Sequence, residues 1–191
     1  MFKDIKKKNS KPSRFYAAVV LLGLIWILSL IQLLGIAPDL IPKLLPRHTS
    51  GLPGIVSMPF THGSLLHLLS NTFPLIVFSI LISLKGNKYF LEVTVSIIII
   101  SGTMLWLMGR SNYHIGASGL VFGYFGFLLM RMYYSPSIST ILISITVFLF
   151  YGGIIFGILP QGGQISWEGH LFGLISGIAV AKMMKANPVD L

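Results

Sequence analysis

Six long apolar stretches divide this chain of 191 residues, and they constrain its fold more than any other feature of the sequence. They cover residues 15–37, 64–84, 90–109, 116–130, 138–159 and 169–184. Roughly 20 residues of α-helix cross the hydrocarbon core of a bilayer, and most of the stretches reach that length. Only 10% of the residues are charged, against about 25% in an ordinary soluble domain. The sequence therefore predicts an all-α membrane protein with six transmembrane helices.

The lengths of the stretches refine this prediction in two ways. A transmembrane β-strand needs only about 10 residues, so the observed lengths favour helices over a barrel. The fourth stretch is the exception, because it holds only about 15 residues before Arg131, or roughly 22 Å of helix. We expect this helix to begin below the membrane surface.

The 14 basic residues predict how the bundle is oriented. With the N-terminus in the cytosol, 11 of them lie on the cytoplasmic side, and only Lys43, Arg47 and Arg110 lie outside. Cytoplasmic loops are enriched in Lys and Arg, so we expect both termini to be cytoplasmic. The first stretch is long for a cleaved signal peptide and lacks a small-x-small cleavage site, which favours a membrane span. The net charge of +9 then indicates contact with anionic lipid and no nucleic-acid partner.

The segments outside the membrane are small, and we expect one membrane domain over residues 15–185. A basic N-terminal segment, 1–14, precedes it, and a short tail, 186–191, follows it. The longest connection, residues 38–63, contains five prolines and is long for a loop without structure. We expect it to be packed or partly embedded. The absence of cysteine excludes disulfides, thiolate nucleophiles and Cys-ligated metals.

Four polar residues inside the apolar stretches are the candidate functional residues, because polar groups are expensive in a membrane. His67 and Asn71 share one helix face in the second stretch, and Ser118 and His170 lie near the starts of the fourth and sixth. Taken singly, they fit interhelical hydrogen bonds, a packing residue, a proton relay or a metal ligand. In the predicted topology these three stretches run in the same direction. All four residues are therefore expected in one layer near the outer face.

Glycines recur at helical spacing in two of these stretches. Spacings of three or four residues place them on one face of each helix, where two backbones approach closely. The glycines are Gly116, Gly119, Gly123 and Gly126 in the fourth stretch and Gly169, Gly173 and Gly177 in the sixth. We expect the two helices to touch, with Gly119, Gly123, Gly173 and Gly177 as packing residues.

The four polar residues together suit nucleophilic catalysis. A serine becomes an effective nucleophile when a neighbouring base accepts its proton, and His170 is the candidate base for Ser118. Asn71, His67 and the backbone N–H of Ser118 are candidate donors to the oxyanion of the intermediate. No acid is placed to complete a triad, since Glu168 lies roughly 200° around the helix from His170. The residues thus predict a Ser–His dyad.

Zinc is the alternative that the histidines raise. His62, His67, His114 and His170 are all expected toward the outer face. No His-Glu-x-x-His pattern and no close carboxylate accompany them. We therefore expect no metal and no cofactor.

These motifs, in this order and on these helices, resemble the rhomboid family of intramembrane serine proteases over roughly residues 60–181. They are His67-x-x-x-Asn71, Gly116-x-Ser118-Gly119 and His170-x-x-Gly173-x-x-x-Gly177, preceded by His62. The resemblance implies a six-transmembrane-helix, rhomboid-like bundle with Ser118 as nucleophile and His170 as general base. It places His67 and Asn71 at the oxyanion site. It also implies that the fifth helix and the loop 160–167 act as gate and cap.

Three positions depart from the family pattern. Leu52-Pro53-Gly54 stands where many members carry Trp-Arg, Phe122 replaces a tyrosine one turn after the serine, and Gly169 replaces an alanine before the last-span histidine. None of these changes removes a reacting group. A phenyl ring at position 122 still allows stacking on His170.

The sequence thus predicts an intramembrane serine endopeptidase that cleaves transmembrane segments of membrane proteins near the outer face. Its partners are transmembrane protein substrates and membrane lipid, and its expected location is a bacterial inner membrane. A helical substrate must unwind to expose its scissile carbonyl, so we expect small or helix-breaking residues near the cut. Two alternatives stay open: a catalytically inactive rhomboid-like protein that binds membrane clients, and a small transporter or channel.

Overall fold

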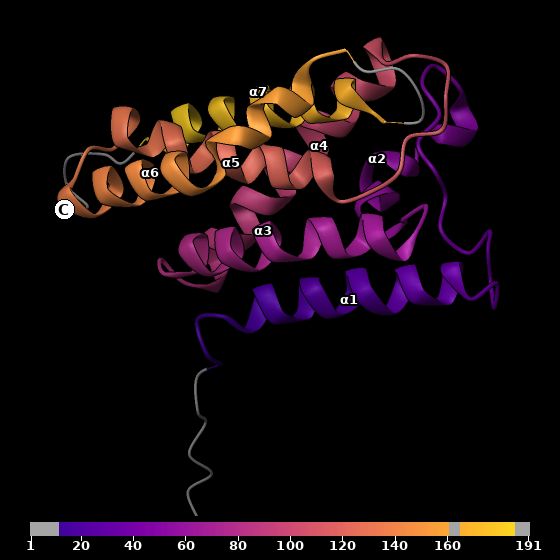
Figure 1. The fold of residues 1–191 in the computed structure, drawn as a ribbon, viewed down its shortest axis with the longest axis horizontal. Helices are drawn as coiled ribbons and strands as arrows, with labels where there is room; N and C mark the ends of the chain where they lie inside the picture. Colours follow the sequence, from indigo (N-terminus) through magenta and orange to yellow (C-terminus); the bar gives the residue numbers. More distant parts are fainter. Residues whose placement is uncertain (1–11, 161–164, 186–191) are drawn as a thin grey trace, which may run out of the picture.

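The computed structural model describes residues 12–160 and 165–185. Within them it contains seven α-helices and no β-strand, which confirms the all-α prediction for the described residues. The helices are α1 (Tyr16–Leu33), α2 (Gly54–Ser57), α3 (Leu65–Ser83), α4 (Asn87–Met108), α5 (Ser118–Tyr134), α6 (Ile138–Tyr151) and α7 (Trp167–Met183). All except the short α2 pack side by side as a bundle (Figure 1). Most of segment 1–14 and all of tail 186–191 lie outside the described residues.

Helix α5 forms the centre of this bundle. It packs against α3, α4 and α6, and most extensively against α7. Eleven of its 17 residues are buried, among them Tyr124, Phe125 and Phe127, which are almost completely shielded. Helix α1 lies at the edge, beside α3 (Figure 1). The start of α5, which carries Ser118, is therefore held by several neighbours.

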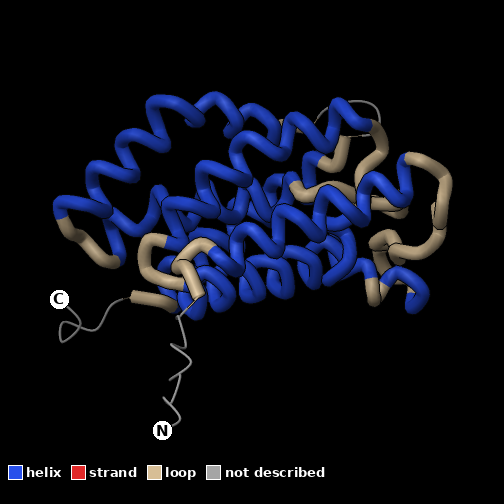
Figure 2. The backbone as a smooth tube through the Cα atoms, turned by 90° about the horizontal axis from the view of Figure 1, so that it is seen from below, coloured by secondary structure: helices blue, strands red, loops and turns tan. Residues whose placement is uncertain are grey.

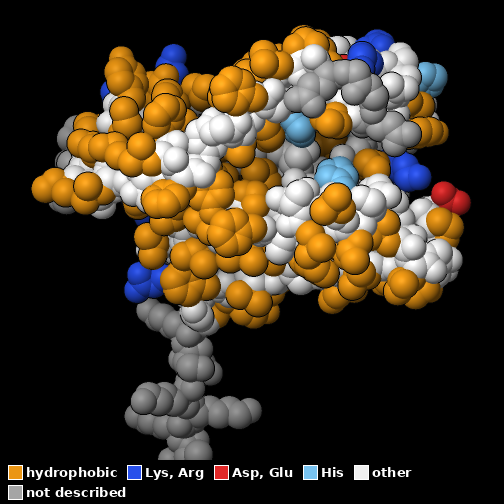
Figure 3. All heavy atoms as spheres, viewed as in Figure 1, with side chains coloured by type: hydrophobic (Ala, Val, Ile, Leu, Met, Phe, Trp, Pro, Cys, Tyr) orange, Lys and Arg blue, Asp and Glu red, His pale blue; other side chains and the backbone are white. Residues whose placement is uncertain are grey.

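The described helices differ in how well they suit a membrane span. Four segments are long and apolar enough to cross a bilayer: Tyr16–Leu33, Leu65–Ser83, Asn87–Met108, and Ile138–Ile158, which combines α6 with a following 3₁₀ helix. Apolar side chains cover much of the face in Figure 3, as expected for a surface in contact with lipid. Helices α5 and α7 have 17 residues each, or roughly 25 Å of rise. The count of six spans therefore stays a prediction.

Several helix ends differ from the apolar stretches, and local chemistry explains the differences. Gly116 has a left-handed φ of 106°, so α5 begins two residues later than its stretch, at Ser118. Ser166 accepts a hydrogen bond from the Gly169 N–H at 3.2 Å. This N-cap starts α7 at Trp167, two residues before its stretch. Helix α6 gives way at Gly152 to a 3₁₀ helix, Gly152–Ile158.

The proline-containing connection, residues 38–63, is packed against the bundle. Leu44 and Met58 are buried and form a small second core with Leu105 of α4. Leu44 also exchanges two backbone hydrogen bonds with His114, at 2.8 and 3.3 Å. The connection therefore covers the end of the bundle at which α5 begins.

The bundle has two distinct ends. The terminal end carries the start of α1, the end of α7 and the α3–α4 and α5–α6 connections (Figures 1 and 2). The opposite, loop end carries the connection 38–63 and the starts of α3, α5 and α7 (Figure 1). The two ends of the described chain thus lie at the same end of the molecule. The assignment of this terminal end to the cytosol remains a prediction.

Candidate active site

The four predicted site residues lie near the starts of three helices at the loop end. Ser118 is the first residue of α5, and His170 is the fourth residue of α7. His67 and Asn71 lie in the first two turns of α3. Histidine side chains are visible near the middle of the face shown in Figure 3, among hydrophobic side chains and atoms of other residues.

Ser118 and His170 lie within hydrogen-bond distance of each other. The Ser118 Oγ is 2.9 Å from His170 Nε2. On the other side of the ring, Nδ1 is 2.9 Å from the carbonyl oxygen of Gly157. Because a carbonyl only accepts, Nδ1 carries the proton and Nε2 is left as the acceptor facing the serine hydroxyl. This is the tautomer that a general base requires.

Gly157 was not identified from the sequence, because any residue supplies a backbone carbonyl. The packing around this position nevertheless favours glycine. A Cβ there would lie 2.8 Å from the Phe122 ring and 3.3 Å from His170 Nδ1. The 3₁₀ helix therefore approaches the imidazole more closely than a larger residue permits.

Phe122 packs against the face of the His170 imidazole and holds it in place. The two rings stack with centroids 4.3 Å apart and an interplanar angle of 4°. Phe122 lies one turn after Ser118 on α5, so the same helix that presents the hydroxyl also supports the histidine. The tyrosine hydroxyl of the family pattern is not needed for this contact.

Glu168 points away from His170, as its position on the helix predicted. Its carboxylate forms a bidentate ion pair with the Arg110 guanidinium, in which Arg110 Nη2 lies 3.1 Å from Glu168 Oε2. Among the described residues, no carboxylate forms a hydrogen bond with His170. The orienting group of the histidine is a neutral carbonyl.

A second network fixes the start of α7. The Nδ1 atom of His114 lies 2.6 Å from the Ser166 hydroxyl oxygen, and its Nε2 donates a hydrogen bond to the Arg110 carbonyl at 3.0 Å. Burial lowers the pKa of His114, which keeps Nδ1 free to accept from the Ser166 hydroxyl. Together with the Arg110–Glu168 pair, this network ties the α4–α5 connection to the helix that carries His170.

His67 and Asn71 flank the backbone that leads into Ser118. A Cβ at Gly116 would lie 2.7 Å from atoms of the His67 ring and 3.8 Å from the Asn71 amide nitrogen. The backbone N–H of Ser118, in the first turn of α5, has no intrahelical acceptor. The helix N-terminus adds a partial positive charge. This side of the serine therefore presents donors suited to a developing negative charge.

His62 holds this side of the site together. Its Nε2 accepts from the Asn71 amide at 3.2 Å and from the Ala117 N–H at 3.3 Å, and its Nδ1 donates to Ser29 Oγ at 2.8 Å. The side chain is completely buried. Burial, and to a smaller degree His67, lowers the pKa of His62 to about 3. A neutral His62 thus links α1, α3 and α5, a role that the sequence pattern did not reveal.

The glycine faces of α5 and α7 meet directly. A Cβ at Gly173 would overlap the Gly119 carbonyl, and a Cβ at Gly177 would overlap that of Gly123. Only glycine permits this approach of the two backbones. The seam begins at Gly119, the residue after Ser118, and at Gly173, one turn after His170, so it sets the distance between their helices.

Comparisons with known proteins agree with this architecture. The family model described as Rhomboid domain matches residues 50–187. Uncharacterized proteins of Mycobacterium tuberculosis and Mycobacterium bovis are each 38% identical over 150 residues, which cover 74% of this chain and 62% of each relative. A putative rhomboid protein of Acanthamoeba polyphaga mimivirus is 30% identical over 125 residues, covering 62% of this chain and 67% of that protein. Because the family model matches well over half of its length, the chain belongs to the rhomboid family.

Proposed function

We propose that this multi-pass membrane protein is a serine endopeptidase that cleaves transmembrane segments of other membrane proteins by a Ser118–His170 dyad. One observation carries the proposal. The Ser118 hydroxyl lies 2.9 Å from an imidazole nitrogen whose opposite nitrogen is held by a carbonyl. This arrangement supplies a nucleophile, a base in the correct tautomer and an orienting group.

The proposed reaction has two halves. His170 Nε2 accepts the hydroxyl proton as Ser118 Oγ attacks the scissile carbonyl carbon, and the same proton is then given to the leaving amine as the C–N bond breaks. Water, deprotonated by His170 Nε2, next attacks the carbonyl carbon of the acyl-enzyme ester. The bond from this carbon to Ser118 Oγ then breaks, His170 returns the proton to Oγ, and the new C-terminal carboxyl group is released. In both halves the oxyanion accepts from the Ser118 N–H, Asn71 and His67. Each such donor typically lowers the activation free energy by about 2.7–4 kcal/mol.

The position of the dyad favours a cut near one membrane face. Ser118 and His170 lie at the loop end of the bundle, which the charge distribution assigns to the outer face. Substrates are transmembrane helices whose small or helix-breaking residues allow the scissile bond to unwind there. By resemblance, α6 and the loop 160–167 act as gate and cap, although Gln161–Gly163 of that loop lies outside the described residues. The proposed location is a bacterial inner membrane.

Labelling by a fluorophosphonate probe tests the proposal. Purified protein is compared with Ser118→Ala and His170→Ala, beside a rhomboid protease of known activity as the positive control. We expect the wild type to be labelled and both variants to lose labelling. A folded wild type that never reacts, under conditions in which the positive control does, would instead favour an inactive family member that binds membrane clients.

A further inference from the structure

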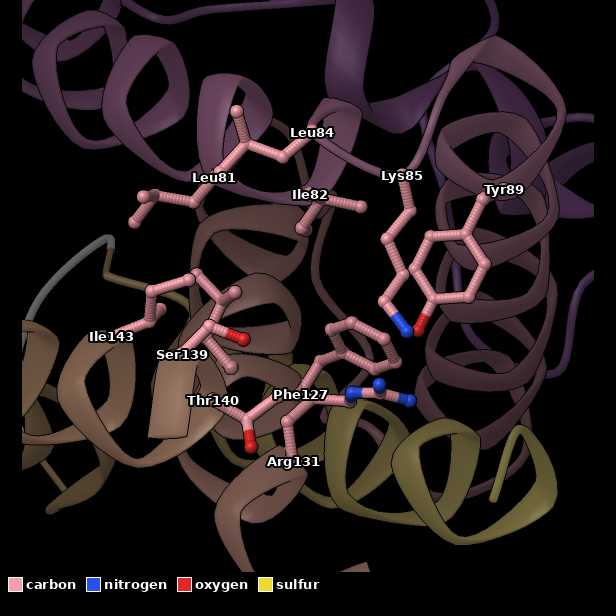
Figure 4. Close-up of a pocket in the computed structure, with 11 residues that line it drawn as sticks. Leu81, Ile82, Leu84, Lys85, Tyr89, Phe127, Arg131, Ser139, Thr140 and Ile143 are labelled. Atoms are coloured by element: carbon pink, nitrogen blue, oxygen red, sulfur yellow. The ribbon is translucent and has the colours of Figure 1, made fainter. Parts of the chain in front are cut away.

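A cavity with basic and apolar walls lies at the terminal end of the bundle, far from the dyad along the helices. Its volume is about 220 Å³, and α3, α4, α5 and α6 all contribute to its lining (Figure 4). Leu81, Ile82, Phe127 and Ile143 form the apolar part. The proposed reaction uses none of these residues.

Two cations meet at the polar part of the cavity. The Lys85 Nζ lies 5.5 Å and the Arg131 guanidinium carbon 5.8 Å from the centroid of the Tyr89 ring. Figure 4 shows the polar ends of these three side chains pointing toward one another. Both cations thus lie within the range of a cation–π contact with the same aromatic ring.

Arg131 is the less usual of the two cations. It is only 5% exposed, and its guanidinium donates to the Met184 carbonyl at 3.3 Å. Among the described residues, the ion pairs are Lys88–Glu92 and Arg110–Glu168, so no carboxylate neutralises Arg131 there. A buried guanidinium without an anionic partner is strongly unfavourable.

The Tyr89 hydroxyl adds a third polar group that lacks a partner. Its oxygen is buried and has no hydrogen-bond partner within the described residues. Buried hydroxyls are normally satisfied. The cavity thus presents the Arg131 guanidinium and the Tyr89 hydroxyl, with Lys85 at its rim, around a space large enough for a small anionic group.

The surroundings indicate which anion fits. The rim residues Leu84, Lys85 and Ser139 are exposed, whereas Ile82 and Thr140 are buried, so the cavity opens to the surface of the bundle. Exposed apolar residues such as Leu84, Ile138 and Leu142 surround the opening. The cavity lies where α3 ends and α6 begins, the level at which the predicted spans would meet the lipid headgroups. A basic pocket between transmembrane helices at this level suits a lipid headgroup.

We propose that this cavity binds the phosphate of an anionic phospholipid. The planar Arg131 guanidinium and the Lys85 ammonium contact the phosphate oxygens, and Tyr89 donates its hydroxyl to the same group. The acyl chains lie along the apolar walls formed by Leu81 and Ile143. The site holds α3, α5 and α6 together through a ligand from the surrounding leaflet.

Binding measurements on the purified full chain in a mild detergent test this proposal. The apparent Tm is followed with short-chain phosphatidylglycerol, with phosphatidylcholine of equal chain length, or with inorganic phosphate. We expect only phosphatidylglycerol to raise the Tm, because ligands that bind the folded state stabilise it. An equal effect of phosphatidylcholine would overturn the headgroup assignment. An equal effect of inorganic phosphate would assign the cavity to a free anion and overturn the lipid assignment.

Three variants make the test specific. Lys85→Gln changes an exposed rim residue, and we expect about fivefold weaker binding of phosphatidylglycerol. Arg131→Lys keeps the charge but loses the planar donor geometry, with an expected weakening of about tenfold. The matched control is Lys182→Gln, an exposed cation near the end of α7 that does not line the cavity, for which affinity should stay within about twofold.

Two outcomes would contradict the site. If Lys85→Gln bound phosphatidylglycerol with unchanged affinity, Lys85 would not be part of the binding site. If Lys182→Gln lost as much affinity as Lys85→Gln, the lipid would be attracted by the general positive charge of the terminal end and not by this cavity. Neither readout involves Ser118 or His170. The test of the lipid site is therefore independent of the proposed protease activity.

Discussion

At the residue scale, the imidazole of His170 depends on one backbone carbonyl and the absence of one methyl group, both at Gly157. Gly157→Ala would place a Cβ 2.8 Å from the Phe122 ring, and this ring stacks on the imidazole. Because small misplacements of catalytic groups are costly, we expect fluorophosphonate labelling to slow by about 10–100-fold. The control is Gly153→Ala in the same 3₁₀ helix, where a Cβ meets nothing within 4 Å. Equal labelling rates in the two variants would contradict the positioning role.

His62 predicts a dependence of stability on pH. Its pKa is lowered to about 3 in the folded protein from an ordinary value of 6.5, so the unfolded chain binds a proton more readily. The corresponding stability is present above pH 6.5 and is lost as the pH falls toward 3, by up to about 1.4 kcal/mol per pH unit. We expect the apparent Tm of His62→Gln to change less between pH 7 and pH 5 than that of the wild type. The control variant is His48→Gln, at an exposed histidine, and a wild-type slope in His62→Gln would refute the assignment.

At the element scale, the glycine seam determines how closely α5 and α7 approach. A Cβ at Gly177 would overlap the Gly123 carbonyl, so Gly177→Ala must push the two backbones apart. Such overpacking typically costs about 1–3 kcal/mol, and we expect a clearly lower apparent Tm in detergent. Gly23→Ala in α1 is the matched control, because a Cβ there meets nothing within 4 Å. That change should be neutral or stabilising, and equal losses in the two variants would rule out the seam as the cause.

The helices themselves could be predicted from the sequence, whereas their exact ends and the contacts between them could not. Apolar length predicts the bundle helices, because a long apolar stretch has few alternatives to a membrane helix. Their ends depend on single backbone positions, such as the left-handed Gly116 and the Ser166 cap, which hydropathy does not report. Residues with reactive side chains, such as Ser118 and His170, are recognisable as motifs. The Gly157 carbonyl and the His62 network are not, because they depend on which elements meet in three dimensions.

At the scale of the whole molecule, two sites lie at opposite ends of one helix bundle. The Ser118–His170 pair lies at the loop end, and the cavity around Arg131 lies at the terminal end. In a bundle that spans the bilayer, opposite ends lie in opposite leaflets, so each site belongs to a different leaflet. The orientation of the bundle therefore decides at once on which side a substrate would be cut and which leaflet would supply the lipid.

The absence of cysteine makes this orientation directly measurable. Asn112→Cys introduces an exposed thiol at the loop end, and Lys185→Cys introduces one at the terminal end. Because Lys and Arg favour the cytoplasmic side, we expect a membrane-impermeant maleimide to label only Asn112→Cys in intact cells. Both thiols should react after permeabilisation, which controls for accessibility. Labelling of Lys185→Cys alone in intact cells would invert the bundle, placing the dyad near the cytosol and the Arg131 cavity in the outer leaflet.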